Sequence, residues 1–444
     1  MLALNDKWYH ALIDKSHMTM IGLLGPDFLF GIAFGQLSSA RRCVMLFRKD
    51  AYLLNGTRWT YQYAFFVDMG GLHLTSPDFP SGFPITGEQL HYLVKHGHVD
   101  FPDMKAMEID ERNTADTLSK FITLLQGIFF SLTEVQRIRK GLPFCSLELT
   151  AMSFVLVMLG TSFCWYYKPS IARCRTIPTK GNKLVARIRA EAKEQTHTDL
   201  DVDVWYRTPV DFIDGHRWGI DANWSYYRRL SQILRVKLFS RPMNNHLWDR
   251  FPSDQWLPPD MALVPYGITV PLGFSSFYLL AWDLQFPTQV EGILWKSAAL
   301  YHLIFILGGG TYYLVEGIRW KKSQDRSKEH RSKATGLDIE SGGEQCHASA
   351  QLLQGEPSSG TNHDEIATLG YGRTRMSVAR WRNNSVDQDP GMAVSLRLII
   401  PVTIASVVYI CARLFLYFED LASLRRQPPG LYLTVNRYLP FLGN

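Results

Sequence analysis

The sequence lacks the motifs that most directly reveal a function. It has no phosphate-binding loop, no dinucleotide-binding glycine pattern, no nucleophile elbow, no HExxH and no CxxC. Its six cysteines are scattered without paired spacing, so no disulfide framework or zinc knuckle is predicted. The N-terminus is charged throughout and lacks the apolar core of a cleavable signal peptide. We therefore expect no cofactor and no metal ion, and we expect an internal segment to direct insertion.

A strong charge imbalance is also missing. Lys and Arg number 47 against 41 Asp and Glu, and no basic patch interleaved with aromatic residues forms a nucleic-acid motif. The basic residues instead gather at the ends of apolar blocks. This placement predicts no nucleic-acid partner, and it favours a lipid bilayer, including an anionic lipid surface.

Apolar residues are present in blocks. The mean hydropathy of the chain is close to neutral, at −0.09, because the blocks alternate with stretches rich in charge, Pro and Gly. A helix of about 20 uncharged residues spans the roughly 30 Å hydrocarbon core of a bilayer. The pattern predicts an all-α, polytopic protein located in a membrane, with about six transmembrane helices.

Four blocks are firm predictions. The first ends in aromatic and basic residues suited to the headgroup layer, and the second contains prolines that predict a kinked or late-starting helix. The third includes a run of three glycines, 308–310, which favours close helix packing over a ligand-lined break. The fourth has an uncharged run of only fifteen residues, 398–412, which is short for a span unless the flanking Arg397 and Arg413 both extend to the headgroups. These blocks are residues 149–167, 261–282, 297–315 and 396–417.

Two earlier blocks decide the total count. Residues 18–40 carry Pro26 and Asp27 near the middle, and residues 121–136 contain a shorter uncharged run. Each is compatible with a full span, a re-entrant segment or a buried helix. With the first firm block they form a predicted N-terminal membrane region, residues 1–167. A further apolar stretch, residues 64–74, is too short to cross.

Basic flanks predict the orientation. Residues 168–189 and 319–333 each contain seven Lys or Arg, whereas residues 283–296 contain two acids and one base. The first two flanks are therefore expected in the cytosol, and the third on the outer side. The basic run 137–140 disagrees, because it would also lie outside.

Two cytosolic regions follow from this topology. Residues 168–260 include a candidate amphipathic helix, 224–241, which fits a helix lying on anionic lipid and a helix packed on the protein equally well. Residues 320–390 have too few large apolar side chains to offset the entropy of ordering, so they are predicted to be disordered. The hairpin 261–319 lies between these regions, and residues 391–444 hold the last span and a tail.

Ionisable residues within or beside the apolar blocks are candidate functional groups, because charge is costly in hydrocarbon. Asp68 has no evident local partner and is the strongest candidate. No catalytic residue is identified. The intramembrane polar candidates are Asp27, Asp68, Glu134 and Glu316.

Three of these candidates also have a structural explanation. Glu316 is placed to pair with Arg319 one helical turn away, and Glu134 is placed to pair with Arg137. Asp27 follows a proline and fits the first turn of a helix, where an acid is favourable.

The one histidine cluster comprises His91, His96 and His98. Thr86 and Gly97 predict the start and the end of a short helix around it. A zinc pair on a helix prefers four-residue spacing, whereas His91 and His96 are five apart. Exposed histidines are therefore favoured over a metal site.

Several longer motifs follow one another in a distinctive order. They are GPDFLFGIAFGQLSSARR, ADTLSKFITLLQGIFFSLTEVQRIRKGLPFCSLELTAMSF, LLAWDLQFPTQVEGILW and VVYICARLFLYFEDLASLR. As a set they resemble a family of uncharacterised multi-span membrane proteins of filamentous fungi. The resemblance implies a membrane location and a fungal source, and it brings no activity and no catalytic residues.

Three functions stay open at this point. The first is a transport, channel-like or sensory component with spans around a cytosolic platform. The second is a membrane-embedded enzyme that acts on a lipid or terpenoid, with intramembrane carboxylates as acids or bases. The third is a membrane scaffold without a small-molecule site. The missing motifs weigh against an enzyme, so the first is preferred.

Overall fold

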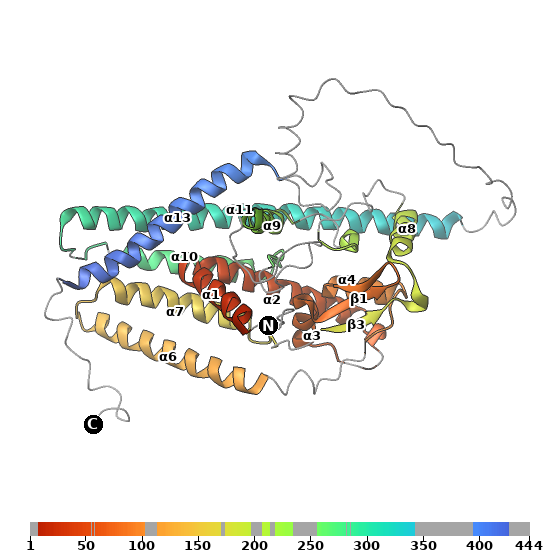
Figure 1. Ribbon diagram of the computed structural model, residues 1–444, viewed down its shortest axis with the longest axis horizontal. Helices are drawn as coiled ribbons and strands as arrows, with labels where there is room; N and C mark the ends of the chain where they lie inside the picture. Colours follow the sequence, from red (N-terminus) through yellow and green to blue (C-terminus); the bar gives the residue numbers. More distant parts are fainter. Residues whose placement is uncertain are drawn as a thin grey trace, which may run out of the picture.

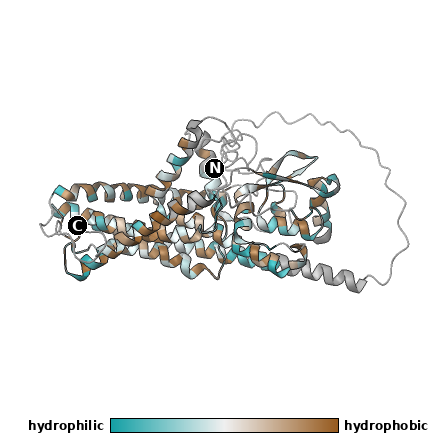
Figure 2. Ribbon diagram, turned by 90° about the horizontal axis from the view of Figure 1, so that it is seen from below, coloured by the Kyte–Doolittle hydropathy of each residue, from teal (hydrophilic) through white to brown (hydrophobic). Residues whose placement is uncertain are grey.

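The chain forms a helical bundle joined to a smaller unit of helices and strands (Figure 1). We call these the bundle and the α/β subdomain. Hydrophobic residues predominate along the bundle, whereas hydrophilic residues are more frequent over the subdomain (Figure 2). The computed structural model describes residues 8–54, 56, 58–102, 113–169, 174–196, 207–213, 218–233, 255–280, 282–284, 286–341 and 394–425.

The bundle is built from long helices that run along its axis or cross it. Helix α7 packs on α2 and α10, and α11 packs on α10 and α13, while α6 lies against α7. The helices are α1 (Trp8–Leu24), α2 (Pro26–Lys49), α6 (Asn113–Arg139), α7 (Ser146–Cys164), α10 (Val264–Leu280), α11 (Gln289–Ser341) and α13 (Leu396–Ala422).

Three helical segments of the described chain are long and apolar enough to cross a membrane. They are Ser146–Cys164, Gln289–Arg326 and Leu396–Arg425, and the bent pair α1 and α2 makes a fourth if it counts as one span. They include the predicted blocks 297–315 and 396–417 and residues 149–164 of the block 149–167. The predicted count of six is not supported. Block 121–136 lies in α6, whose apolar run is flanked by polar turns, and block 261–282 yields the shorter α10.

The block at residues 18–40 is broken near its middle. Helix α1 ends at Leu24, α2 begins at Pro26, and the two helices are bent by 110°. Proline at the first position of α2 supplies no backbone N–H to continue α1. Asp27 lies in the first turn of α2, so its predicted place at a helix start is confirmed.

The predicted hairpin 261–319 contains a proline-rich helix start and a run of three glycines. Helix α10 begins at Val264 and contains Pro271, which confirms the late start. The glycine run 308–310 in α11 is exposed, and a Cβ added at any of the three would meet no atom within 4 Å. The expected close packing at these glycines is therefore not made within the described part of this chain.

The α/β subdomain contains a three-stranded sheet in the order β2-β1-β3. Strand β1 pairs antiparallel with β2 in a hairpin and parallel with β3, which follows α7 about 100 residues later in the chain. Its elements are α3 (Tyr61–Phe66), η2 (Val67–Gly71), β1 (Leu72–Ser76), β2 (Phe79–Pro84), α4 (Gly87–Lys95), β3 (Arg175–Pro178) and α8 (Val185–Thr196). The all-α prediction is corrected here, because short strands paired across distant segments leave no long sequence pattern.

The C-terminal half of α2 belongs to the core of this subdomain. Phe47 on α2 is fully buried together with Phe65, Leu72 and Phe83, and Ile188 of α8 joins the same core. One continuous helix therefore connects the bundle rigidly to the subdomain.

Two predicted cytosolic segments are helical over their described parts. Helix α9 (Gly219–Ile233) covers the first half of the predicted helix 224–241, and Tyr227 hydrogen-bonds Thr403 of α13 at 2.6 Å. This contact packs α9 on the bundle, while residues 234–241 lie outside the described residues. Helix α11 continues to Ser341, so it includes the first part, 320–341, of the segment predicted to be disordered. Residues 342–390 lie outside the described chain.

Candidate functional site around Arg413

Arg413 lies on α13 with none of its surface exposed. Its Nη1 donates a hydrogen bond to the hydroxyl of Tyr278 at 2.5 Å, and its Nε donates to the hydroxyl of Tyr417 at 2.8 Å. The guanidinium carbon is 4.7 Å from the ring centre of Phe274 and 5.0 Å from that of Phe154. Helices α7, α10 and α13 thus supply an aromatic cage, which attracts a cation through the ring faces.

No carboxylate completes this cage within the described chain. Arg413 makes no ion pair there, and its Nη2 has no hydrogen-bond partner. The expectation that Arg413 extends to the headgroups is therefore wrong. Helix α13 continues beyond it to Ala422, so the arginine lies within the candidate span and faces the other helices.

Asp27 approaches the same cluster from the bend between α1 and α2. The hydroxyl of Tyr409 donates to Asp27 Oδ1 at 2.6 Å, and the Tyr409 ring stacks on His302 with ring centres 5.2 Å apart. His302 Nε2 lies 3.5 Å from Arg413 Nη1. Tyr417 donates to the carbonyl of Leu23 at the end of α1. Both halves of the broken helix therefore contact the arginine side of α13.

The polar chain continues toward the opposite end of the bundle. The Tyr278 hydroxyl is 3.3 Å from Ser153 Oγ on α7. One turn away, Thr150 donates to Asp420 Oδ2 at 2.7 Å, and Asp420 is fully buried. We call the set Asp27, Tyr278, His302, Tyr409 and Arg413 the bundle cluster.

The bundle cluster lies at mid-depth. The ring of Phe154 faces Arg413, and Phe154 lies in the central turn of α7. This helix runs from Ser146 to Cys164. At 1.5 Å per residue the two ends of this helix are about 12 Å and about 15 Å away along the axis. The cation is therefore far from both ends of α7, whereas Tyr278, which it contacts, lies near the end of α10 at Leu280.

Asp68 lies in the α/β subdomain and not in a span. It is 4% exposed, its Oδ1 accepts a hydrogen bond from the backbone N–H of Gly87 at 2.8 Å, and burial raises its pKa to about 6. The intramembrane placement predicted for Asp68 is corrected, because residues 64–74 fold into α3, η2 and β1.

The remaining two candidates are paired locally. Glu316 accepts a hydrogen bond from Arg319 at 2.9 Å, and Glu134 is 3.9 Å from Arg137. Arg137 also lies 3.2 Å from Glu148. Neither glutamate contacts the bundle cluster, so only Asp27 of the four predicted residues belongs to it.

The histidine cluster separates onto different partners. The predicted helix is confirmed as α4, with Thr86 as its N-cap in a capping box and Gly97 at φ +68. His91 lies 2.9 Å from Asp50, His96 bonds a backbone carbonyl, and His98 faces Lys183. Within the residues that the structure describes, no three His, Cys, Asp or Glu side chains are grouped to hold a metal ion.

The sequence analysis did not identify Arg413, Tyr409 and His302 as site residues, although their positions in the sequence indicate contact with other helices. Tyr409, Arg413 and Asp420 recur at spacings of four and seven, which places them on one face of a helix. His302 stands inside the block 297–315, which counts as uncharged if histidine is neutral. Polar residues on one face of an apolar helix indicate contact with other helices instead of lipid.

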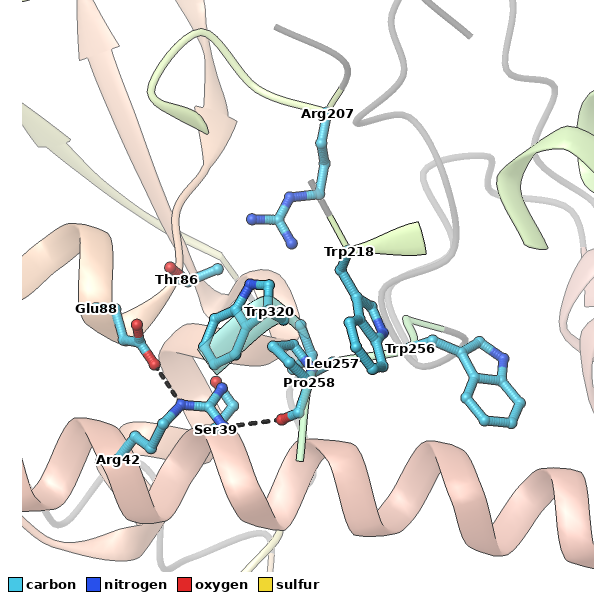
Figure 3. A pocket seen from close by; sticks show the side chains of 10 residues that line it. All are labelled: Ser39, Arg42, Thr86, Glu88, Arg207, Trp218, Trp256, Leu257, Pro258 and Trp320. Carbon is cyan, nitrogen blue, oxygen red and sulfur yellow. Dashed lines mark hydrogen bonds and ion pairs between the residues drawn. The ribbon is translucent and has the colours of Figure 1, made fainter. Parts of the chain in front are cut away.

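Apart from the bundle cluster, the structure contains a polar pocket where the bundle meets the subdomain, which we call the junction pocket (Figure 3). It is a small, open pocket with a cavity volume of about 30 Å³. Its walls combine two arginines and three tryptophans from segments far apart in the chain. The lining residues are Ser39, Arg42, Thr86, Glu88, Arg207, Trp218, Trp256, Leu257, Pro258 and Trp320.

Comparisons with known proteins found no matching family model, no matching curated protein and no matching solved structure. A functional assignment therefore depends on the geometry of this chain.

Proposed function

We propose that the protein is a multi-pass membrane protein of the transport, channel-like or sensory class, with the bundle cluster as its functional centre. The observation that carries the proposal is Arg413, a fully buried arginine with no ion pair in the described chain. Removing a charge from water costs several kcal/mol, which a neutral aromatic cage offsets only in part. Apolar side chains would build a more stable scaffold, so the arginine is better explained by an activity.

The break at Gly25 supports transport in particular. Transporters commonly bind substrates and ions near the bilayer midplane, where half-helices end inside the membrane. Here the N-terminus of α2, with its partial positive charge, begins beside Tyr409 of the bundle cluster. A helix end, the Asp27 carboxyl group and a buried cation therefore meet at one depth and form a polar environment inside the bundle.

Exposed apolar side chains support the membrane placement. Ile304 on α11 is 57% exposed, Ile404 on α13 is 60% exposed, and Phe418 is 70% exposed. Such surfaces are favourable against lipid and unfavourable against water. We propose that α7, α10, α11, α13 and the bent pair α1 and α2 form the membrane region, with α6 along its outside.

The positions of the basic flanks support a cytosolic subdomain. The segment 174–189 and the part of α11 after residue 318 lie toward the subdomain, while the α10–α11 connection lies at the opposite end (Figure 1). The basic run 137–140, which disagreed with this orientation, is partly neutralised by Glu134 and Glu148. The fungal family resemblance stays a proposal, and it implies no activity.

A flux measurement on reconstituted protein tests the proposal. The purified full-length chain is placed in liposomes, and the movement of protons and of small anions is recorded with entrapped indicators. Arg413→Gln is expected to abolish the flux, because it removes the buried positive charge. Arg397→Gln is the matched control, since Arg397 is an exposed arginine on the same helix.

Equal flux through both variants would contradict a functional role for Arg413. No flux from the unaltered protein, with either sign of membrane potential, would exclude transport of these ions. Asp68 lies outside the bundle, so an enzyme with intramembrane carboxylates loses its strongest candidate residue.

A further inference from the structure

The bundle cluster has one member at its edge and four members inside. Asp27 is partly exposed, whereas none of the other four is more than 1% exposed. Asp27 also follows the break at Gly25, where α1 and α2 are bent by 110°. It is therefore the member of the cluster that a solute outside the bundle can reach.

Asp27 is also the member that can change its charge near neutral pH. Tyrosine hydroxyls and guanidinium groups keep their protons there. His302 Nε2 lies 3.5 Å from Arg413 Nη1, and because a guanidinium only donates, this nitrogen accepts and the imidazole is neutral. A second proton on His302 would place two cations side by side away from water, which is unfavourable.

The groups around Asp27 come from several helices. The titratable and charged ones are, from α13, Tyr409, Arg413 and Tyr417, from α11 His302, and from α10 Tyr278. Helix α1 contributes the carbonyl of Leu23, and α7 contributes the hydroxyl of Ser153. The nearest of these to Asp27 is Tyr409, whose hydroxyl donates to Oδ1 at 2.6 Å.

Arg413 makes the protonation state of Asp27 important for the whole cluster. When Asp27 is ionised, its negative charge balances the guanidinium, although the two groups make no ion pair in the described chain. When Asp27 is protonated, the charge of Arg413 is left uncompensated away from water, which costs free energy. The cluster therefore alternates between no net charge and a net positive charge as it gains and loses a proton.

Two hydrogen bonds connect α13 to both sides of the helix break. Tyr409 donates to Asp27 at the start of α2, and Tyr417 donates to the carbonyl of Leu23 near the end of α1. A hydrogen bond to an ionised carboxylate is stronger than one to a neutral acid. Protonation of Asp27 therefore weakens the contact of α13 with α2 and leaves its contact with α1.

We propose that the substrate of the bundle cluster is the proton, that Asp27 binds it, and that the bend at Gly25 couples its binding to a movement of α2 against α13. The Asp27 carboxylate takes up the proton from water on one side of the bilayer and releases it to water on the other side, so no other covalent bond forms or breaks. Arg413 is a positioning residue in this step. The proposal rests on the transport function proposed above.

Infrared difference spectroscopy tests the proton site directly. Spectra of the full-length protein in lipid nanodiscs are recorded at acidic and at neutral pH, and their difference contains the carbonyl stretch of carboxyl groups that take up a proton. Asp27→Asn is expected to remove one component of this band, because an amide does not take up the proton. Glu316→Gln is the matched control, since Glu316 is also a carboxyl of a candidate span, is paired with Arg319 and lies outside the cluster. It is expected to keep that component.

Proton flux into liposomes under an imposed pH gradient tests the substrate. Asp27→Asn is expected to abolish the flux, Asp27→Glu to retain part of it because the carboxyl is kept, and Glu316→Gln to carry protons like the unaltered protein. Tyr409→Phe decides the infrared result if Asp27→Asn does not fold. It keeps the carboxyl, removes the hydroxyl that bonds it, and is expected to shift the Asp27 component.

The proposal is overturned if Asp27→Asn and Tyr409→Phe both leave the infrared difference unchanged, or if Asp27→Asn carries protons like the unaltered protein. Anion flux that is lost in Arg413→Gln and kept in Asp27→Asn would support transport and overturn the proton as its substrate. An Asp27 component in the infrared difference without flux of any ion would support the proton site and overturn the transport function.

Discussion

In the α/β subdomain, Asp50 receives hydrogen bonds from Lys95 at 2.8 Å and from His91 at 2.9 Å, while Arg413 in the bundle meets only hydroxyls, a histidine and aromatic rings. In the subdomain Asp50 is thus paired at the edge of water, although Asp68 is buried there with no ion pair among the described residues. The bundle retains a cation at mid-depth without a carboxylate. This difference locates the unusual chemistry of the protein in the bundle.

The two regions also differ in what covers their apolar side chains. The subdomain buries Phe65, Leu74 and Phe83 completely, as a water-soluble unit does. The bundle leaves large apolar residues such as Ile304 and Phe418 more than half exposed. The subdomain is therefore suited to water and the bundle to lipid. Comparing the same type of side chain in the two regions tests this difference.

Two exposed cysteines are expected to show the largest contrast. Cys174 lies beside β3 in the subdomain and Cys411 lies on α13. In a Cys346→Ser background, a membrane-impermeant maleimide should label Cys174 fully in opened membranes and should leave Cys411 unlabelled. The reason is that the reagent attacks a thiolate, which needs water.

Single substitutions Cys174→Ser and Cys411→Ser identify the labelled position by mass spectrometry, and detergent-denatured protein serves as the control in which both thiols react. Labelling of Cys411 in opened membranes at the rate of Cys174 would show that α13 faces water.

Replacing a phenylalanine is expected to destabilise the subdomain more than the bundle. Phe65→Ala removes a fully buried ring from the subdomain core and should cost about 3–5 kcal/mol. Phe418→Ala, at a position 70% exposed on α13, should cost less than about 1 kcal/mol in a bilayer, because lipid replaces the lost contacts. Thermal unfolding of both variants in nanodiscs measures this, and similar losses would mean that Phe418 is covered by protein.

Two carboxyls of the subdomain should respond to pH with opposite sign. Burial raises the pKa of Asp68 to about 6 from an ordinary value of 3.8, so the unfolded chain releases this proton first and stability falls as pH rises between these values. Asp68→Asn should remove that decline and stabilise the protein at pH 7 by up to about 3 kcal/mol.

Asp50 is the counterpart, because a hydrogen bond from Lys95 lowers its pKa. Its contribution is present above its ordinary pKa and is lost as pH falls through the lower folded value, so Asp50→Asn should destabilise the protein at pH 7. Stability curves between pH 3 and 8 separate the two. A pH 7 loss on Asp68→Asn would show that its hydrogen bonds outweigh its burial.

Much of the bundle could be predicted from sequence. The predicted blocks 297–315 and 396–417 and most of the block 149–167 lie in long apolar helices, and Pro26 was recognised as a helix start before Asp27. These features depend on residues next to one another in the chain. The sheet was missed because β3 joins β1 across about 100 residues, and such pairing leaves no local period.

The candidate site was predictable only in part. Asp27 was named, whereas Arg413 was interpreted as a boundary of its block, because a charge in a hydropathy pattern normally marks the end of a span. The aromatic rings that allow this charge to be buried come from α7 and α10. Asp68 was assigned to an apolar stretch that in fact folds into the subdomain.

The sequence by itself determined that this chain has helices long and apolar enough to cross a membrane, because helix length and hydropathy are properties of consecutive residues. Only the tertiary structure decided which charge lies inside the bundle and which pocket opens at its end. Burial of Arg413 requires Phe154, Phe274 and Tyr278 to meet it. Contacts between residues more than a hundred positions apart are set by helix packing, and no single stretch of sequence encodes them.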